Sequence, residues 1–148
     1  MFSVAGGVVV LDQWMKAWVE HVRPHIEVIP GFFNLVYVRN RGAAFGILQQ
    51  KQLFLTAVSV LAIAVLVYLL LKESPEKKGL LLALALILGG TVGNCIDRVR
   101  LKYVVDFLNF HIKHYQWPSF NVADSAISIG VALLVIMTII DQRKPQKA

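Results

Sequence analysis

The sequence contains few residues of the kinds that form disulfide bonds or bind metals. Its 148 residues include one cysteine and four histidines. A single cysteine excludes a disulfide within the chain and any thiolate metal cluster. The histidines show no zinc-site spacing beyond the weak pair His111 and His114, so we expect neither a metal nor a cofactor.

Charged residues are also scarce. They make up 16% of the chain and hydrophobic residues 57%, against about 25% and about 45–50% in typical soluble domains. The length permits one domain, 1–148, and the apolar excess places it in a bilayer. The net charge of +6 comes from scattered basic residues without interleaved exposed aromatics, which argues against a nucleic-acid partner. Membrane lipids with anionic headgroups are the expected partners of this charge.

Long apolar runs predict four membrane-spanning helices, and the expected fold is therefore an all-α membrane protein. A helix needs about 20 apolar residues to cross the hydrocarbon core. The predicted spans cover residues 1–19, 53–71, 79–96 and 121–140. Charges and a proline in Lys72–Lys78 separate the second span from the third. Four spans place both termini on one side of the membrane.

Two longer segments, 20–52 and 98–120, connect the spans on the face opposite the termini. The first contains a β-branched and aromatic stretch, 27–39, with Pro30-Gly31 as a turn signal. We expect it to form a small β-rich segment against the membrane surface, between the first and second spans. The second contains the aromatic stretch 115–120, which is typical of a membrane interface.

The distribution of basic residues indicates the orientation. The 72–78 loop and the C-terminal tail hold six basic residues in two very short stretches, whereas the longer loops and the ends of their spans hold nine. A raw count by the positive-inside rule favours termini outside, and the density of charge favours termini in the cytoplasm. We adopt the second interpretation.

Polar residues converge on the face that carries the two long segments. An Asp or Lys at a helix centre costs about 2.5–3.5 kcal/mol on insertion scales, so such residues face a protein interior or an aqueous cavity. The first span carries a polar residue in its later half, the third span ends with several polar residues, and the fourth span begins with two. These residues are Asp12, Asn94, Asp97, Arg98, Asn121 and Asp124, and the loop 40–46 lies on the same side. We expect a functional site at this face.

Several of these residues have structural interpretations as well. Asn121 and Asp124 have the spacing of an N-cap and an acidic N3 residue, and taken alone this interpretation is as good as catalysis. Asp12 and Lys16 stand four residues apart on a helix, which favours a structural ion pair. Asp97 is adjacent to Arg98 in the chain but faces a different direction, so each needs another partner.

Asp106 has no comparable structural explanation. It lies between apolar neighbours in Tyr103–Leu108, where a carboxylate is costly. No nucleophilic serine motif and no nucleotide-binding glycine loop is present. Paired carboxylates remain: Asp106 and Asp124, with Asp12 and Asp97 near. Two carboxylates that share a proton can activate water, as in aspartic proteolysis, although composition does not select the pair.

Five short motifs resemble those of the bacterial lipoprotein signal peptidase (signal peptidase II) family. They occur in the family's order on a four-span frame and extend over nearly the whole chain. The motifs are Asp12-Gln-x-x-Lys16, Asn40-Arg-Gly-Ala-Ala-Phe45, Gly93-Asn-Cys-Ile-Asp-Arg98, Val104-Val-Asp-Phe107 and Phe120-Asn-Val-Ala-Asp-Ser125.

The resemblance implies an aspartic endopeptidase of the bacterial cytoplasmic membrane with its active site at the outer face. The implied substrate is a diacylglyceryl-modified prolipoprotein, cut before its lipidated cysteine, and the implied state is a monomer. The resemblance makes Asp106 and Asp124 the catalytic dyad. The remaining matched residues become substrate-holding or supporting groups: Asn40, Gly42, Asn94, Arg98, Asn121, Asp12, Lys16 and Asp97.

Two other functions are compatible with a small membrane protein. A four-helix transporter could use Asp12 or Asp124 to carry a proton, but transporters bind substrate near the midplane and open to both faces. Here the acids gather toward one face. A structural subunit of a larger complex would explain neither Asp106 nor the asparagines.

Overall fold

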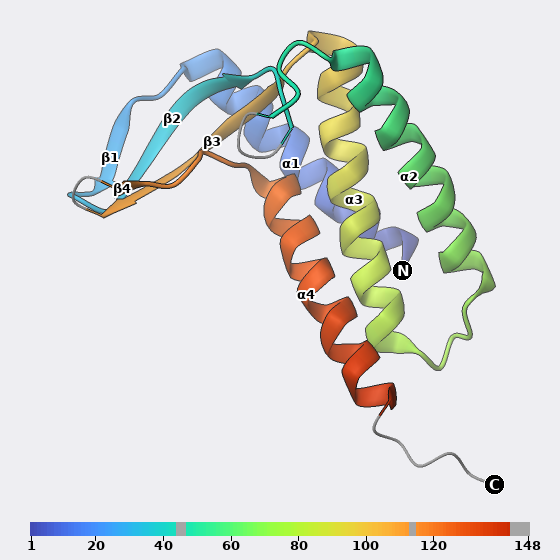
Figure 1. Ribbon diagram of the computed structural model, residues 1–148. Helices are drawn as coiled ribbons and strands as arrows, with labels where there is room; N and C mark the ends of the chain where they lie inside the picture. The colour runs from blue at the N-terminus through green and yellow to red at the C-terminus, as the bar shows by residue number, and fades with distance from the viewer. Residues whose placement is uncertain (44–46, 113–114, 143–148) are drawn as a thin grey trace, which may run out of the picture.

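The computed structural model describes residues 1–43, 47–112 and 115–142, with side chains to residue 140 (Figure 1). The described residues form four helices and one four-stranded sheet. In order they are α1 (Phe2–Val22), β1 (Ile26–Ile29), β2 (Phe33–Asn40), α2 (Gln52–Lys72), α3 (Lys78–Leu101), β3 (Val104–Ile112), β4 (Tyr115–Gln116) and α4 (Val122–Gln142).

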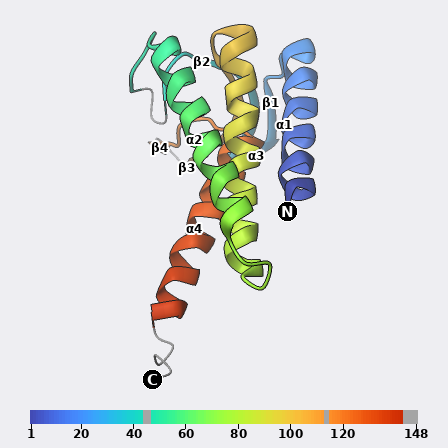
Figure 2. The same ribbon diagram turned by 90° about the vertical axis from the view of Figure 1, so that its right-hand side faces the viewer.

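The predicted apolar runs all form helices, and the helices are slightly longer than the runs. In the described part of the chain, α2, α3 and the Val122–Ile140 part of α4 are long and apolar enough to cross a membrane. α1 has 21 residues, the same length as α2, but it carries Asp12, Lys16 and Glu20. α3 occupies the centre of the bundle, packs against the other three helices and lies between α1 and α2 in Figure 2.

Glycines of α3 allow close approach of two neighbouring helices. A Cβ added at Gly89 would lie 2.7 Å from the carbonyl oxygen of Ala5 in α1. A Cβ at Gly90 would collide with the carbonyl oxygen of Ala123 in α4. In lipid, helices associate through close packing of small residues rather than through the hydrophobic effect. These glycines therefore allow α1 and α4 to pack closely against α3.

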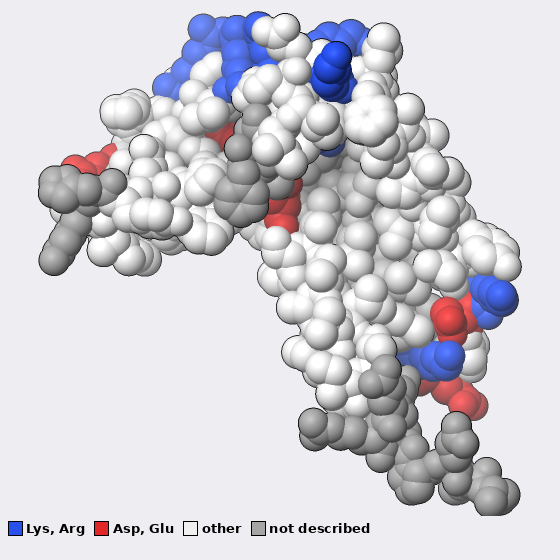
Figure 3. All heavy atoms as spheres, in the orientation of Figure 1, with Lys and Arg blue, Asp and Glu red and all other residues white. Residues whose placement is uncertain are grey.

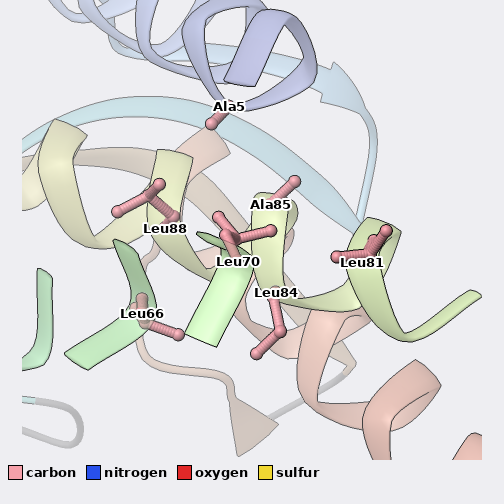
Figure 4. Packing of buried hydrophobic residues seen from close by; sticks show 7 residues of the cluster. All are labelled: Ala5, Leu66, Leu70, Leu81, Leu84, Ala85 and Leu88. Atoms are coloured by element: carbon pink, nitrogen blue, oxygen red, sulfur yellow. The ribbon is translucent and has the colours of Figure 1, made fainter. Parts of the chain in front are cut away.

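Leucines fill the space between α2 and α3 away from the sheet. They form a buried cluster that Ala5 of α1 closes on one side (Figure 4). The cluster is Ala5, Leu66, Leu70, Leu81, Leu84, Ala85 and Leu88. It contains no polar side chain, and the buried polar residues of α1 and α3, Asp12, Lys16, Asn94 and Asp97, lie toward the other end of the bundle.

The sheet draws on both long segments, which corrects the prediction of a β-rich segment between the first two helices only. Its order is β1-β2-β3-β4, and neighbouring strands are antiparallel. β3 and β4 come from the segment between α3 and α4, and the fold is thus helical with a sheet rather than all-α. The missed strand begins with Val104–Phe107, which is buried throughout. A strand buried on both faces lacks the alternating pattern that marks a half-exposed one.

The sheet is fixed to the bundle through β3. Val105 and Phe107 pack with Val19 of α1 in a second buried cluster. The chain entering α4 lies along β3, because the amides of Phe107 and Leu108 both donate to the carbonyl of Phe120. The sheet consequently projects from the end of the bundle where α1 and α3 end, with the α2–α3 linker at the opposite end (Figure 1). This arrangement sets β3 beside the first turn of α4.

Candidate active site

Asp106 is a buried carboxylate on the central strand β3, with 2% of its surface exposed. Both of its oxygens accept hydrogen bonds from asparagine amides. Nδ2 of Asn40, on β2, lies 3.0 Å from Oδ2, and Nδ2 of Asn121 lies 2.7 Å from Oδ1. The backbone amide of Gly42 donates to Oδ1 of Asn40 at 2.9 Å, which turns the Asn40 amide nitrogen toward Asp106.

The environment of Asp106 favours its protonated form. Burial, followed by the negative charge of Asp124, raises the pKa of Asp106 to about 7, while the hydrogen bonds from Asn40 and Asn121 act in the opposite direction. The group can therefore exchange a proton near neutral pH, as a general acid or base requires.

Asp124 lies in the first turn of α4, where the helix dipole favours a negative charge. It exchanges hydrogen bonds with Asn121. The Asp124 amide donates to Oδ1 of Asn121 at 2.9 Å, and the Asn121 amide donates to Oδ2 of Asp124 at 3.3 Å. This reciprocal pair is a capping box, and it confirms the prediction that Asn121 caps the helix. Asn94 of α3 adds a third contact, from its Nδ2 to Oδ1 of Asp124 at 2.7 Å.

Asn121 connects the two carboxylates. Its side-chain oxygen caps α4, its side-chain nitrogen donates to Asp106, and its backbone amide donates to Asp124. The residue is fully buried. The same residue thus caps α4 and contacts both carboxylates.

A buried network of ion pairs between α1 and α3 supports the site. Nζ of Lys16 lies 2.8 Å from Oδ2 of Asp12 and 3.0 Å from Oδ2 of Asp97. The predicted pairing of Asp12 with Lys16 is confirmed, and Lys16 proves to be the partner that Asp97 required. Lys16 also donates to Oδ1 of Asn94 at 2.9 Å, which directs the Asn94 amide nitrogen toward Asp124.

The same network ties backbone groups of two other elements. Oδ1 of Asp12 accepts the Ala123 amide at 2.9 Å, and Oδ2 of Asp97 accepts the Val105 amide at 3.1 Å. Gln13, which the sequence reasoning did not single out, donates to Oδ1 of Asp97 at 3.0 Å. Its sequence signal was its place in the Asp12-Gln-x-x-Lys16 motif. The backbone of Val105, next to Asp106, is therefore held by α3, and the backbone of Ala123, next to Asp124, is held by α1.

Arg98 is half-buried on α3 and makes weak contact with the rest of the site. Its Nη1 lies 3.5 Å from the carbonyl oxygen of Asn94, and its buried Nε has no hydrogen-bond partner among the described residues. Arg98, Asn94 and Asp124 line one side pocket of about 300 Å³. Donor groups of Arg98 are consequently left for a ligand in that pocket.

Asp106 and Asp124 line a shared cavity of about 600 Å³ between the sheet and α4. The other walls come from the β2 end, the 117–120 stretch and the first turns of α4. Acidic atoms are visible in the hollow between the sheet and the helices in Figure 3. Within the described residues, no group of three or more histidine, cysteine or acidic side chains could hold a metal. The arrangement can therefore perform acid–base chemistry with two carboxylates on a molecule bound in the cavity.

The chain is similar to lipoprotein signal peptidases over nearly its whole length. A family model described as signal peptidase (SPase) II matches residues 4–140. The lipoprotein signal peptidase of Syntrophus aciditrophicus (strain SB) is 43% identical over 148 residues, which cover 95% of this chain and 92% of the relative. That of Symbiobacterium thermophilum is 45% identical over 139 residues, covering 92% and 91%.

Two solved structures share the fold. One, described as a bacterial membrane enzyme structure by the in meso method at 2.3 Å resolution, superposes with a TM-score of 0.89 at 36% identity. It covers 98% of this chain and 92% of that chain. A second, at 1.9 Å resolution, has a TM-score of 0.81 at 38% identity and covers 91% and 89%. Sequence and structure agree, and they confirm the resemblance: the chain is a membrane-embedded protease that belongs to the signal peptidase II family.

Proposed function

We propose that this protein is an aspartic endopeptidase that removes signal peptides from diacylglyceryl-modified prolipoproteins, cutting before the lipidated cysteine. The observation that carries the aspartic mechanism is the placement of Asp106 and Asp124 in one cavity, bridged by Asn121. Family membership supports the prolipoprotein as substrate.

The two carboxylates divide the work of hydrolysis. Asp124, at a helix N-terminus and hydrogen-bonded by Asn94, is the ionised member, and Asp106 is the protonated one. Asp124 takes a proton from water as the water oxygen bonds to the scissile carbonyl carbon, while Asp106 donates its proton to the carbonyl oxygen. When the carbon–nitrogen bond breaks, the amine leaves with a proton from the dyad. The pair titrates as a unit, and both protonation states recur in each turnover.

The remaining site residues position these groups or the substrate. Asn40, held by Gly42, orients Asp106, and Asn121 serves both carboxylates. Arg98 directs its free donors at a peptide carbonyl or an ester of the lipidated cysteine. Asn94 orients Asp124 and is itself held by the buried network of Lys16 and its two carboxylates.

We place α1 across the membrane as the fourth span. Its 21 residues cover about 32 Å at 1.5 Å per residue, close to the thickness of the hydrocarbon core. Asp12 and Lys16 are buried against the rest of the protein, so they do not meet lipid tails. The protein then sits in the bacterial cytoplasmic membrane as a monomer, with cytoplasmic termini and the cavity at the outer face. There the acyl chains of a substrate stay in the outer leaflet while its scissile bond reaches the cavity.

A proton-coupled transporter is the weaker function. The buried ionisable residues of the described helices, Asp12, Lys16 and Asp97, lie toward the sheet end of the bundle, whereas the other half of α2 and α3 is packed with leucine. A transporter would need polar groups that can be reached from both faces.

A cleavage assay tests the proposed mechanism. The purified protein is incubated with a diacylglyceryl-modified prolipoprotein, and the product is followed by gel shift. Asp106→Asn and Asp124→Asn should each abolish cleavage, and the double substitution should be no worse. The control, Thr138→Ala, alters an exposed hydroxyl far from the cavity and should cleave normally. Normal cleavage by either aspartate variant would disprove the dyad, and failure of the unmodified protein to cut any lipidated substrate would disprove the substrate class.

A further inference from the structure

Exposed basic side chains gather at the sheet end of the protein. They cover the top of the molecule in Figure 3, over the ends of α1 and α3 and the start of α2. The exposed residues in this region are Arg23, Arg39, Arg41, Lys51, Arg100 and Lys102. Glu20 is the neighbouring acidic residue and is only half-buried. This end of the bundle is therefore strongly positive, although the basic residues look scattered along the chain.

The position of these residues along the membrane normal matches that of the lipid phosphates. Arg23 follows the last residue of α1, Lys51 precedes α2, and Arg100 stands in the last turn of α3. These helices have 21, 21 and 24 residues, or about 32–36 Å at 1.5 Å per residue, which spans the hydrocarbon core. Side chains at their ends lie in the headgroup layer.

Two of the arginines form an ordered cluster with two tyrosines, which we call the Arg–Tyr cluster: Arg23, Tyr37, Arg39 and Tyr103. The guanidinium of Arg39 lies 5.4 Å from the ring centre of Tyr37 and 5.2 Å from that of Tyr103. The guanidinium of Arg23 lies 5.6 Å from the ring centre of Tyr37. Two cations thus share one aromatic ring.

A chain of hydrogen bonds fixes the orientation of Arg39. Its Nε donates to the Tyr37 hydroxyl at 2.9 Å, the two tyrosine hydroxyls lie 3.2 Å apart, and the Tyr103 hydroxyl donates to Oε1 of Glu20 at 3.1 Å. Glu20 is therefore engaged by a phenol rather than by an arginine. The contact with Tyr37, burial and the contact with Glu20 raise the pKa of Tyr103 to about 12, so Tyr103 adds no negative charge.

Among the described residues, no carboxylate forms an ion pair with either arginine of the cluster, although the negative charge of Glu20 acts on Arg39. The ion pairs among the described residues involve Lys16 and Lys77 and neither arginine of the cluster. Two guanidinium groups on one ring repel each other unless an anion lies between them. A guanidinium binds phosphate oxygens with two parallel donors, and stacking on an aromatic ring holds that fork in place.

We propose that the Arg–Tyr cluster is a binding site for the phosphate group of an anionic phospholipid, seated at the edge of the sheet. A lipid fits better than a free anion because the cluster stands at the end of membrane-spanning helices, where phosphodiester headgroups are abundant and fixed in height. The site adjoins the proposed active-site cavity, because Arg39 and its neighbour Asn40 both line that cavity. The bound lipid would tether the sheet to the bilayer surface. This inference does not depend on the peptidase activity.

Native mass spectrometry of the full chain tests the site. The protein in a neutral detergent is titrated with phosphatidylglycerol or with phosphatidylcholine of the same acyl chains, and the lipid-bound population is measured. The test variant is the double substitution Arg23→Gln, Arg39→Gln. The matched control is Arg100→Gln, Lys102→Gln, which removes the same charge from the same face without touching the tyrosines. A third variant, Arg39→Lys, keeps the charge and removes the planar fork.

We expect the unmodified protein to prefer phosphatidylglycerol. Because it loses the charge-assisted hydrogen bonds of two guanidinium forks, the cluster variant should bind it about thirtyfold more weakly. The control, which loses only diffuse surface charge, should weaken binding by no more than about fivefold, and Arg39→Lys should fall in between. Unfolding temperatures of the variants, read from the reactivity of buried Cys95, should match the unmodified protein. Equal weakening by the cluster variant and the control would show diffuse surface charge and overturn the proposal. Lack of lipid preference, or displacement of the lipid by inorganic phosphate at matching concentration, would overturn it as well.

Discussion

Replacement of Asp106 by asparagine should change how the stability of the protein depends on pH. Both oxygens of Asp106 accept hydrogen bonds from amide nitrogens, one from Asn40 and one from Asn121. Asparagine offers one acceptor and one NH₂ group, so one of these bonds is lost. Loss of this hydrogen bond lowers the free energy of unfolding by about 1 kcal/mol at every pH. The titration of the carboxyl group disappears as well, and this second effect depends on pH.

The magnitude follows from the raised pKa of Asp106. Its value of about 7, against an ordinary 3.8, means that the folded protein keeps the proton over a range of pH in which the unfolded chain has lost it. The contribution of Asp106 to stability is therefore greatest below about pH 4, falls as the pH rises toward 7, and is level above 7. At about 1.4 kcal/mol per pH unit, the total loss is about 4 kcal/mol. About 3 kcal/mol of this loss falls between pH 5 and pH 9.

Cys95 supplies the assay. It is the only cysteine of the sequence and it is buried in α3, so a thiol-reactive dye reports unfolding in detergent. Free energies of unfolding are measured for the unmodified protein and Asp106→Asn at pH 5 and pH 9. The stability of the variant relative to the unmodified protein should rise by about 3 kcal/mol between these values. Thr138→Ala, which removes no titrating group, should follow the unmodified protein throughout.

Parallel pH curves for Asp106→Asn and the unmodified protein would refute the reasoning. They would mean that Asp106 has the same pKa in the folded and unfolded chain. The proposed division between a protonated Asp106 and an ionised Asp124 would then lose its physical basis, and the direction of proton transfer would have to be reassigned.

Four further outcomes are expected. Gly90→Ala should destabilise the protein by about 1–3 kcal/mol because its Cβ meets the backbone of α4, whereas Gly7→Ala, with nothing within 4 Å, should be tolerated; equal unfolding temperatures would contradict this packing. Lys16→Met should cost about 3–5 kcal/mol because it leaves two buried carboxylates without their cation; the exposed counterpart Lys77→Met should cost less than about 1 kcal/mol, and similar losses would show that burial is unimportant. Arg98→Lys should reduce cleavage far more than thermal stability, since it keeps the charge and loses the planar fork; matched losses would make its role structural. Activity should survive a chelator such as EDTA, and recovery by zinc after a loss would contradict an aspartic mechanism.

The helices and several local contacts could be predicted from the sequence because they depend on neighbours in the chain. Apolar runs identify the helices, the spacing of four identifies the pair of Asp12 and Lys16, and the spacing of three identifies the cap formed by Asn121 on Asp124. Helix ends were less accurate. α3 continues to Leu101, beyond the predicted end of the apolar run.

Contacts between distant segments could not be predicted in this way. The partner of Asp97 is Lys16, 81 residues earlier, and the partner of Asp106 on the neighbouring strand is Asn40, 66 residues earlier. Strand β3 was missed because its first residues are buried on both faces and show no alternation. The carboxylate in this strand was nevertheless recognised as unusual, since its cost in apolar surroundings is a local property.

Asn121 both caps α4 and donates to Asp106, and this has a consequence for the synthesis of the protein. The residue becomes fixed only when it caps α4, the last helix to leave the ribosome and enter the membrane. Until then Asp106 lacks one of its two amide donors, and Asp124 has not joined the cavity. A nascent chain with three inserted helices therefore holds half of the proposed dyad and cannot hydrolyse a peptide. Proteolytic competence should arise in a single step, when the final helix docks, so that incomplete chains stalled during insertion are harmless to the membrane proteins around them.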